Sequence, residues 1–279
     1  MPSESVEGGQ RFCLFHEAHG SPARGQIVYV HPFAEEMNKS RRMAALQARA
    51  FAQAGYDVLQ IDLLGCGDSS GDFGDATWQA WVNDVVQGCR WLRCRNSASG
   101  AGSQLPALWL WGLRAGCLVA VEAARALDTP CNFIFWQPPA SGKPLLQQFL
   151  RLKVAGDMLG GQAKGAMEYL RQQLDTGEAV EIAGYRLSPE LAAGLEQALP
   201  VPPLDSGRVE RLEWFEMSTR ADAQLSPISG KIFALWQTAA IAARSHVVNG
   251  PAFWQTSEIE EAPALILVTL AAVNQMAGA

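Results

Sequence analysis

The chain has 279 residues, 48% of them hydrophobic and 18% charged, and a formal net charge of −6. This composition is typical of a globular protein that buries a sizeable core. Acidic and basic residues are spread without a block of like charge, which argues against nucleic acid or an anionic membrane as the main partner. Lys39, Arg41 and Arg42 form the only basic cluster, and we interpret them as a solvated helix face.

The six cysteines form no CxxC pair, and the first residues lack a basic-then-apolar signal pattern. We therefore expect free thiols and a cytoplasmic location. The most apolar stretch, Ala262 to Val273, is too short to cross a bilayer, so we expect a buried helix and no integral membrane segment.

In the first half of the chain, short apolar runs alternate with longer helical patterns. The expected strands are 26–30, 56–62, 108–112 and 132–137. The expected helices are 35–55, a helix capped by Asp75 or Thr77 that runs to about residue 94, and 115–127. This alternation predicts a mostly parallel, doubly wound α/β sheet.

The rhythm changes between about residues 140 and 203, where only helical patterns occur, at 143–159, 163–174 and 188–199. We interpret this stretch as a helical cap inserted into a single domain that spans 1–279. Sheet and helix signals then resume, with a strand at 208–217, a helix at 228–244, a short strand at 246–248 and a final helix at 257–275.

Three motifs follow predicted strands. A glycine-rich run extends from Asp62 to Gly71 and has the pattern D-x-x-G-x-G-x-S-x-G. The second motif is His31-Pro32-Phe33, and the third is Gly112-Leu113-Arg114-Ala115-Gly116. In this order they resemble the loops of the α/β-hydrolase superfamily, in which the second motif helps to form the oxyanion hole and the third is the nucleophile elbow.

A narrower resemblance rests on HPFAEEMNKSRR from His31, LWGLRAG around Arg114 and GPAFWQTSEIEEAPALI from Gly250. These stretches resemble the exosortase A system-associated hydrolases, type 2, which accompany bacterial exopolysaccharide and protein-sorting loci. The resemblance implies a hydrolase of unsettled substrate that serves polysaccharide or envelope production.

The expected catalytic triad is incomplete. Arg114 occupies the nucleophile position, and a guanidinium stays protonated and is not a nucleophile. Asp222, after the strand at 208–217, is the candidate acid, or else a turn residue. The histidine expected near Trp254 is missing, and His246 lies too early, so we interpret His246 as an ordinary strand histidine.

Arg114 is instead predicted to bind an anion, because the elbow directs its side chain into the pocket at a helix N-terminus. Glu35 or Glu36 is the expected partner, forming either a structural ion pair or a carboxylate base that activates water. His31 either faces the ligand or bonds to backbone.

Four further residues are predicted to border the ligand. Phe33 belongs to the oxyanion-type loop, Leu113 and Ala115 flank Arg114, and Trp254 is expected to contact a sugar face or an acyl chain.

Two functions remain open. One is a hydrolase that acts on an ester, acyl or glycan-linked small-molecule substrate without a serine nucleophile. The other is a non-catalytic binding protein for an acidic ligand or a protein partner; a purely structural role would leave no pocket. The four histidines have no metal-ligand spacing, and no phosphate-binding glycine motif follows the first strand, so we expect neither a metal nor a cofactor. The oligomeric state is open.

Overall fold

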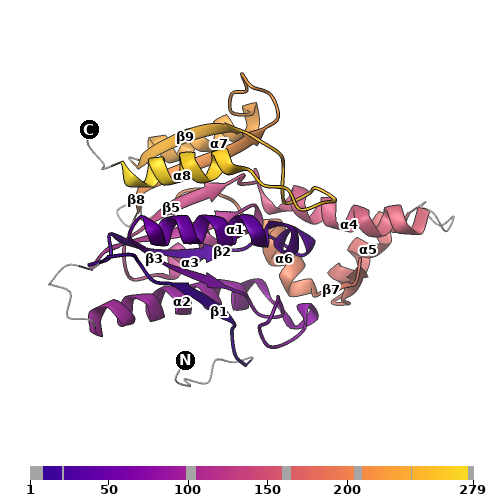
Figure 1. The fold of residues 1–279 in the computed structure, drawn as a ribbon. Helices are drawn as coiled ribbons and strands as arrows, with labels where there is room; N and C mark the ends of the chain where they lie inside the picture. The colour runs from indigo at the N-terminus through magenta and orange to yellow at the C-terminus, as the bar shows by residue number, and fades with distance from the viewer. Residues whose placement is uncertain are drawn as a thin grey trace.

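The computed structural model describes residues 9–20, 22–98, 105–158, 165–203, 209–239 and 241–275. Within these ranges the main sheet has seven strands in the order β1-β3-β2-β4-β5-β8-β9 (Figure 1). The strands are β1 Cys13–His16, β2 Gly25–Val30, β3 Tyr56–Ile61, β4 Ala107–Leu113, β5 Cys131–Trp136, β8 Val209–Ser218 and β9 Ala242–Asn249. Edge strand β1 pairs antiparallel with β3, whereas the other pairs are parallel.

Helices cover both faces of this sheet. Helices α1 (Glu35–Gln53) and α8 (Pro263–Asn274) bury apolar side chains in one core. On the opposite face, α2 (Trp78–Ala98), α3 (Ala115–Ala126) and α7 (Pro227–Thr238) share a larger core. A single 3-10 turn, η1, covers Phe73–Asp75. This arrangement confirms the predicted mostly parallel, doubly wound α/β sheet, and it brings the carboxyl ends of the parallel strands together at one edge.

The segment between β5 and β8 adds no strand to the main sheet in its described part. It contains α4 (Gly142–Met158), α5 (Ala166–Asp175), the antiparallel pair β6 (Val180–Ile182) and β7 (Tyr185–Leu187), and α6 (Pro189–Gln197). Figure 1 shows α4 and α5 extending beyond the body of the sheet. Helix α6 packs closely against the Trp78 side chain of α2: a Cβ at Gly194 would lie 2.1 Å from the Cβ of Trp78.

The β6–β7 hairpin was not predicted. Its strands have three residues each, too few to show a period of two against the surrounding helical pattern. Ala183 and Gly184 connect them with φ values of 49° and 84°, the positive values that a tight two-residue hairpin turn requires.

Three predicted elements in the C-terminal part had wrong boundaries. The helix predicted over 228–244 ends at Thr238, and β9 is longer than the predicted strand 246–248. The final helix begins at Pro263 instead of residue 257, because proline lacks the N–H that a helix interior needs and suits a first turn. The outer ends of three predicted elements, at Leu159, 163–164 and Arg208, lie outside the described residues.

Candidate functional site

Arg114 stands at a sharp turn between β4 and α3, as predicted for an elbow. Its φ of 54° and ψ of −119° are unfavourable for any residue with a Cβ. The glycines on either side are required by packing, because a Cβ at Gly112 would lie 2.5 Å from the Cys117 amide nitrogen. A Cβ at Gly116 would lie 2.1 Å from the Val30 carbonyl oxygen. The motif therefore forms the strand-turn-helix geometry that its spacing indicated.

The side chain of Arg114 forms an ion pair with Glu36, in the first turn of α1. Nε and Nη2 of the arginine each lie 3.2 Å from Oε1 of Glu36, and both side chains are largely buried, with 12% and 16% exposed. Gln255 Nε2 donates to the same oxygen at 3.4 Å. The guanidinium carbon also lies 5.7 Å from the ring centroid of Trp254. Arg114 thus interacts with two other predicted site residues, Glu36 and Trp254.

Glu35, the other candidate partner, contacts the inserted segment instead. Its carboxylate accepts a hydrogen bond of 3.0 Å from the hydroxyl of Tyr185, in β7. Burial and the negative charge of Glu35 raise the pKa of Tyr185 to about 12, so this phenol stays protonated and donating at neutral pH. The structure places Glu35 at the junction between α1 and the hairpin, apart from Arg114.

His31 lies buried at the end of β2 and bonds to backbone groups. Its Nδ1 lies 2.8 Å from the Pro32 carbonyl oxygen, and its Nε2 accepts from the Leu63 amide at 3.2 Å. Because Nε2 accepts, the ring is neutral and carries its proton on Nδ1. Burial lowers the pKa of His31 and favours the same state. Nε2 therefore connects the end of β2 to the loop after β3, whereas Nδ1 bonds the adjacent residue Pro32.

Phe33, Leu113 and Ala115, predicted to border a ligand, lie in the packed interior. Phe33 makes edge-to-face contacts with Phe73 and Phe149, with ring centroids 5.4 and 5.1 Å apart. Leu113 and Ala115 are each 1% exposed. In the structure these side chains support the elbow and the junction with α4 by packing.

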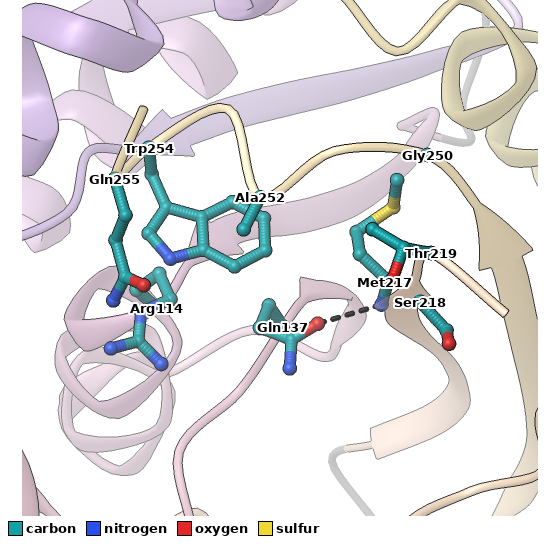
Figure 2. Close-up of a pocket in the computed structure, with 9 residues that line it drawn as sticks. All are labelled: Arg114, Gln137, Met217, Ser218, Thr219, Gly250, Ala252, Trp254 and Gln255. Carbon is teal, nitrogen blue, oxygen red and sulfur yellow. Dashed lines mark hydrogen bonds between the residues drawn. The ribbon is translucent and has the colours of Figure 1, made fainter. Parts of the chain in front are cut away.

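A pocket of about 400 Å³ opens beside Arg114, where the ends of β4, β5 and β8 meet the loop that follows β9. Figure 2 shows its polar lining, to which Arg114, Gln137, Ser218, Thr219, Trp254 and Gln255 contribute. Sequence analysis missed Gln137, Ser218, Thr219 and Gln255. A usable signal existed for Gln137, since it ends the predicted strand beside the elbow strand, where ligands of open α/β sheets bind.

The predicted acid and the displaced histidine do not line this pocket. Asp222 is exposed in the turn between β8 and α7. His246 lies within β9, as predicted, with its Nε2 2.9 Å from Oε2 of Glu213 and its ring stacked on Phe215 at 4.6 Å. These contacts fix His246 in the sheet.

Other nucleophiles near the elbow are also poorly placed. Cys117 is fully buried in α3, and burial raises the pKa of its thiol well above the ordinary value. Ser218 and Thr219 line the pocket, but no histidine does. Within the described ranges, no group of three His, Cys, Asp or Glu side chains gathers as metal ligands would. The chemistry available is that of a guanidinium, a paired carboxylate and neutral hydrogen-bonding groups.

Comparisons with known proteins agree with the architecture. No protein-family model matches the sequence. Human protein ABHD12B is 29% identical over 116 residues, a match that covers 42% of this chain and 29% of that protein. The chain thus aligns with less than a third of this human protein.

Solved structures align over nearly the whole chain. Est1E from Butyrivibrio proteoclasticus, solved with bound ferulic acid, has a TM-score of 0.63 at 13% identity, with 94% of each chain covered. A carboxyl esterase from Bacillus coagulans has a TM-score of 0.59 at 12% identity, covering 95% of this chain and 93% of its own. The protein therefore has the α/β-hydrolase fold, and identities this low establish the fold without the reaction.

The structure also bears on membrane association. In the part of the chain that the structure describes, no helix combines the length and apolar character needed to span a bilayer.

Proposed function

We propose that the pocket beside Arg114 is the functional site and that it binds an acidic small molecule. The observation that carries this proposal is a pair of strained residues in the pocket wall. Arg114 and Gln137 have φ values of 54° and 47°, end neighbouring strands, and both line the cavity. Such backbone strain costs about 1–3 kcal/mol per residue and tends to persist at functional sites.

Electrostatics support an acidic ligand. Arg114 stands at the N-terminus of α3, where the helix dipole favours negative charge. Nε and Nη2 are used by Glu36, and none of the described residues binds Nη1, which leaves a donor for a ligand oxygen. Since Glu36 already balances the arginine, a ligand carboxylate would share the guanidinium with it.

A second candidate function is hydrolysis of an ester, acyl or glycan-linked substrate without a serine nucleophile. The position of Glu36 favours it, because this carboxylate lies at the elbow, where it can activate a water molecule. Two proteins of similar fold, a carboxyl esterase and Est1E, which was solved with ferulic acid, agree with an acyl substrate. Against it, Arg114 and Gln255 already occupy Glu36 Oε1, which leaves this oxygen less available to a water molecule.

The resemblance to exosortase A system-associated hydrolases sets the context of both candidates. We propose a role beside exopolysaccharide or envelope production in the cytoplasm, carried out by one domain whose helical insertion, at about residues 140–203, covers the elbow as a cap. Gln148 of α4 supports the position of the cap over the elbow, since its Oε1 lies 3.5 Å from Nη2 of Arg114.

One experiment separates the two candidates. We would assay p-nitrophenyl esters of acetate, octanoate and palmitate, and in parallel measure the shift in melting temperature with benzoate and ferulate. The proteins are the wild type, Arg114→Ala, Glu36→Gln and Glu35→Gln, with Glu168→Gln on exposed α5 as the matched control. Acid-dependent stabilisation that Arg114→Ala abolishes, with hydrolysis at buffer background, supports the binding protein.

Turnover that disappears in Glu36→Gln but survives in Glu35→Gln and the control would instead establish the hydrolase. If neither acids nor esters interact with the wild type, the pocket is not the site of either function.

A further inference from the structure

We propose that Gln137 and Trp254 form a donor pair that binds a carboxylate oxygen of the ligand. This inference rests on the proposed function and names the groups that orient the ligand in the same pocket. Unlike Arg114, both residues are neutral. The pair would therefore select the ligand by the position of its acceptor atoms and would set the orientation of the bound carboxylate.

Trp254 supplies the first donor. The residue is 4% exposed and lines the pocket, yet its Nε1 is buried without a hydrogen-bond partner. A buried N–H without an acceptor is costly and uncommon, so an acceptor from outside the protein is its natural complement. Figure 2 shows the nitrogen-bearing edge of the indole turned toward the side of the pocket where Arg114 and Gln137 lie.

The ring of Trp254 is held in this orientation by its neighbours. Phe253 packs against it edge to face, with ring centroids 5.1 Å apart. The guanidinium carbon of Arg114 lies 5.7 Å from the centroid of the Trp254 ring. The donor is thus positioned before a ligand arrives, which lowers the entropic cost of binding.

Gln137 supplies the second donor. Its Oε1 accepts a hydrogen bond of 2.7 Å from the Met217 amide, drawn as the dashed line in Figure 2. This bond fixes the amide orientation, because the nitrogen cannot accept from an N–H. The Nε2 group has no partner among the described residues, so its protons are available to a ligand acceptor. The positive φ of 47° at Gln137 is unfavourable for a residue with a Cβ, and the Gln137 amide donates to the Phe215 carbonyl oxygen at 2.7 Å, which fixes the backbone from which this side chain extends.

The remaining lining also favours an acceptor on the ligand. The Oγ of Ser218 accepts from the Arg220 amide at 3.1 Å, which leaves its proton free to donate. Arg114 is a donor only. A carboxylate can accept from each of these groups, whereas only the Ser218 hydroxyl among them could accept from an ammonium ion. The volume of about 400 Å³ lies in the range of small-molecule pockets.

The test replaces the donor at position 137 and keeps the fold. Gln137→Glu retains an oxygen for the Met217 amide but turns the Nε2 donor into a charged acceptor. We would titrate benzoate, ferulate and neutral benzamide into the wild type, Gln137→Glu and Gln79→Glu, a matched change on the exposed surface of α2. We expect about 10- to 100-fold weaker binding of both acids to Gln137→Glu, and unchanged binding to Gln79→Glu.

A second readout follows the indole directly. In a ¹⁵N–¹H spectrum, the Trp254 indole signal is identified by its loss in Trp254→Phe, and we expect benzoate to shift its proton downfield. If the acids bind and Arg114→Ala weakens them, but this signal and the Gln137→Glu affinity do not change, the donor pair is wrong and the proposed binding function stands. Benzamide binding as tightly as benzoate would refute the carboxylate class. No binding of any acid would remove both proposals.

Discussion

Ala34 and Arg114, the residues that precede the helices after two neighbouring strands, adopt nearly the same strained backbone conformation. Their φ and ψ values are 49° and −126° for Ala34 and 54° and −119° for Arg114. Each is the N-cap of the helix that follows its strand, α1 or α3, and β2 pairs in parallel with β4. A second elbow-like turn, at Ala34, therefore precedes α1, as the one at Arg114 precedes α3. Only the one at Arg114 lines the pocket, and the one at Ala34 directs α1 so that Glu36 reaches Arg114.

The elbow at Ala34 predicts a stabilising substitution. Ala34→Gly should raise the free energy of unfolding by about 1 kcal/mol, because glycine relieves strain of about 1–3 kcal/mol while it adds a smaller entropy to the unfolded chain. Urea unfolding followed by circular dichroism measures the change. The matched control is Ala50→Gly within α1, which should lower stability by about 0.5–1 kcal/mol. Equal losses in both variants would contradict the strain at Ala34.

Gly116 should tolerate no side chain. Gly116→Ala would place its Cβ 2.1 Å from the Val30 carbonyl oxygen, so β2 and α3 would have to separate. We expect a loss of about 3 kcal/mol or more, or failure to fold. Gly230→Ala in α7 is the control, because no atom lies within 4 Å of its added Cβ and helix propensity predicts a gain of about 0.5–1 kcal/mol. Similar melting temperatures for Gly116→Ala and wild type would show that the elbow packs differently.

The ion pair between Arg114 and Glu36 should contribute more than a surface pair does. A double-mutant cycle with Arg114→Met and Glu36→Gln is expected to give a coupling energy of about 1–2 kcal/mol, because both side chains are largely buried. Urea unfolding of the four proteins measures it. The pair Glu122 and Arg125 on α3, with 29% and 37% exposed side chains, should give about 0.5 kcal/mol or less in the same experiment. A smaller coupling at Arg114 than at Arg125 would refute the prediction.

How far could the sequence alone predict this site? The elbow followed from Gly112 and Gly116, whose spacing reflects two backbone contacts. The sequence predicted either Glu35 or Glu36 as the partner of Arg114, and the positions of these two residues on α1 distinguish them. Glu36 shares a helix stripe with Ser40 and Met43, which are buried, and so it faces the body of the protein. Glu35 lies one residue away, a rotation of about 100° around the helix.

Other features depended on contacts that no local pattern encodes. Gln137 could be placed at the right strand end, but its fixed amide depends on Met217, which is 80 residues away. His246 was correctly assigned to a strand, whereas its partner Glu213 depends on the register of β8 against β9. Contacts between distant parts of the chain therefore determined which polar residues line the pocket and which are held inside the sheet.

The buried carboxylate of Glu213 predicts a pH-dependent stability. Burial alone would raise its pKa, but hydrogen bonds from His246, Arg244 and Arg211 together lower the pKa of Glu213 below its usual value. The folded protein thus holds this carboxylate charged at pH values where the unfolded chain has begun to bind a proton. Its contribution is fully present above the usual glutamate value of about 4.3 and is lost as the pH falls through the lower folded value.

Glu213→Gln should consequently lower the free energy of unfolding by about 3 kcal/mol at pH 7, since it leaves the largely buried Arg211 and the partly exposed Arg244 without their carboxylate. The difference from the wild type should shrink as the pH falls below about 4. Urea titrations at pH 7, 5, 4 and 3 measure it, with exposed Glu168→Gln as the reference. A difference that stays constant with pH would show that Glu213 is not charged in the folded state.

Restoring a serine at the elbow should not restore esterase chemistry. Arg114→Ser would place a hydroxyl in the nucleophile position, but a serine needs a histidine in hydrogen-bond reach to remove its proton. His246 is held in β9 by Glu213, and His31 spends both ring nitrogens on backbone groups. Removal of the guanidinium also leaves Glu36 without its main partner.

We therefore expect Arg114→Ser to hydrolyse p-nitrophenyl acetate at the rate of buffer alone, and to lose any stabilisation by benzoate that the wild type has. Arg125→Ser on α3 is the matched control, and it should keep the response of the wild type to benzoate. Hydrolysis by Arg114→Ser more than about tenfold above the control would mean that a base does reach the elbow, because a positioned general base contributes about 10²–10⁴-fold. Glu36, freed from Arg114, would then be the group to replace next.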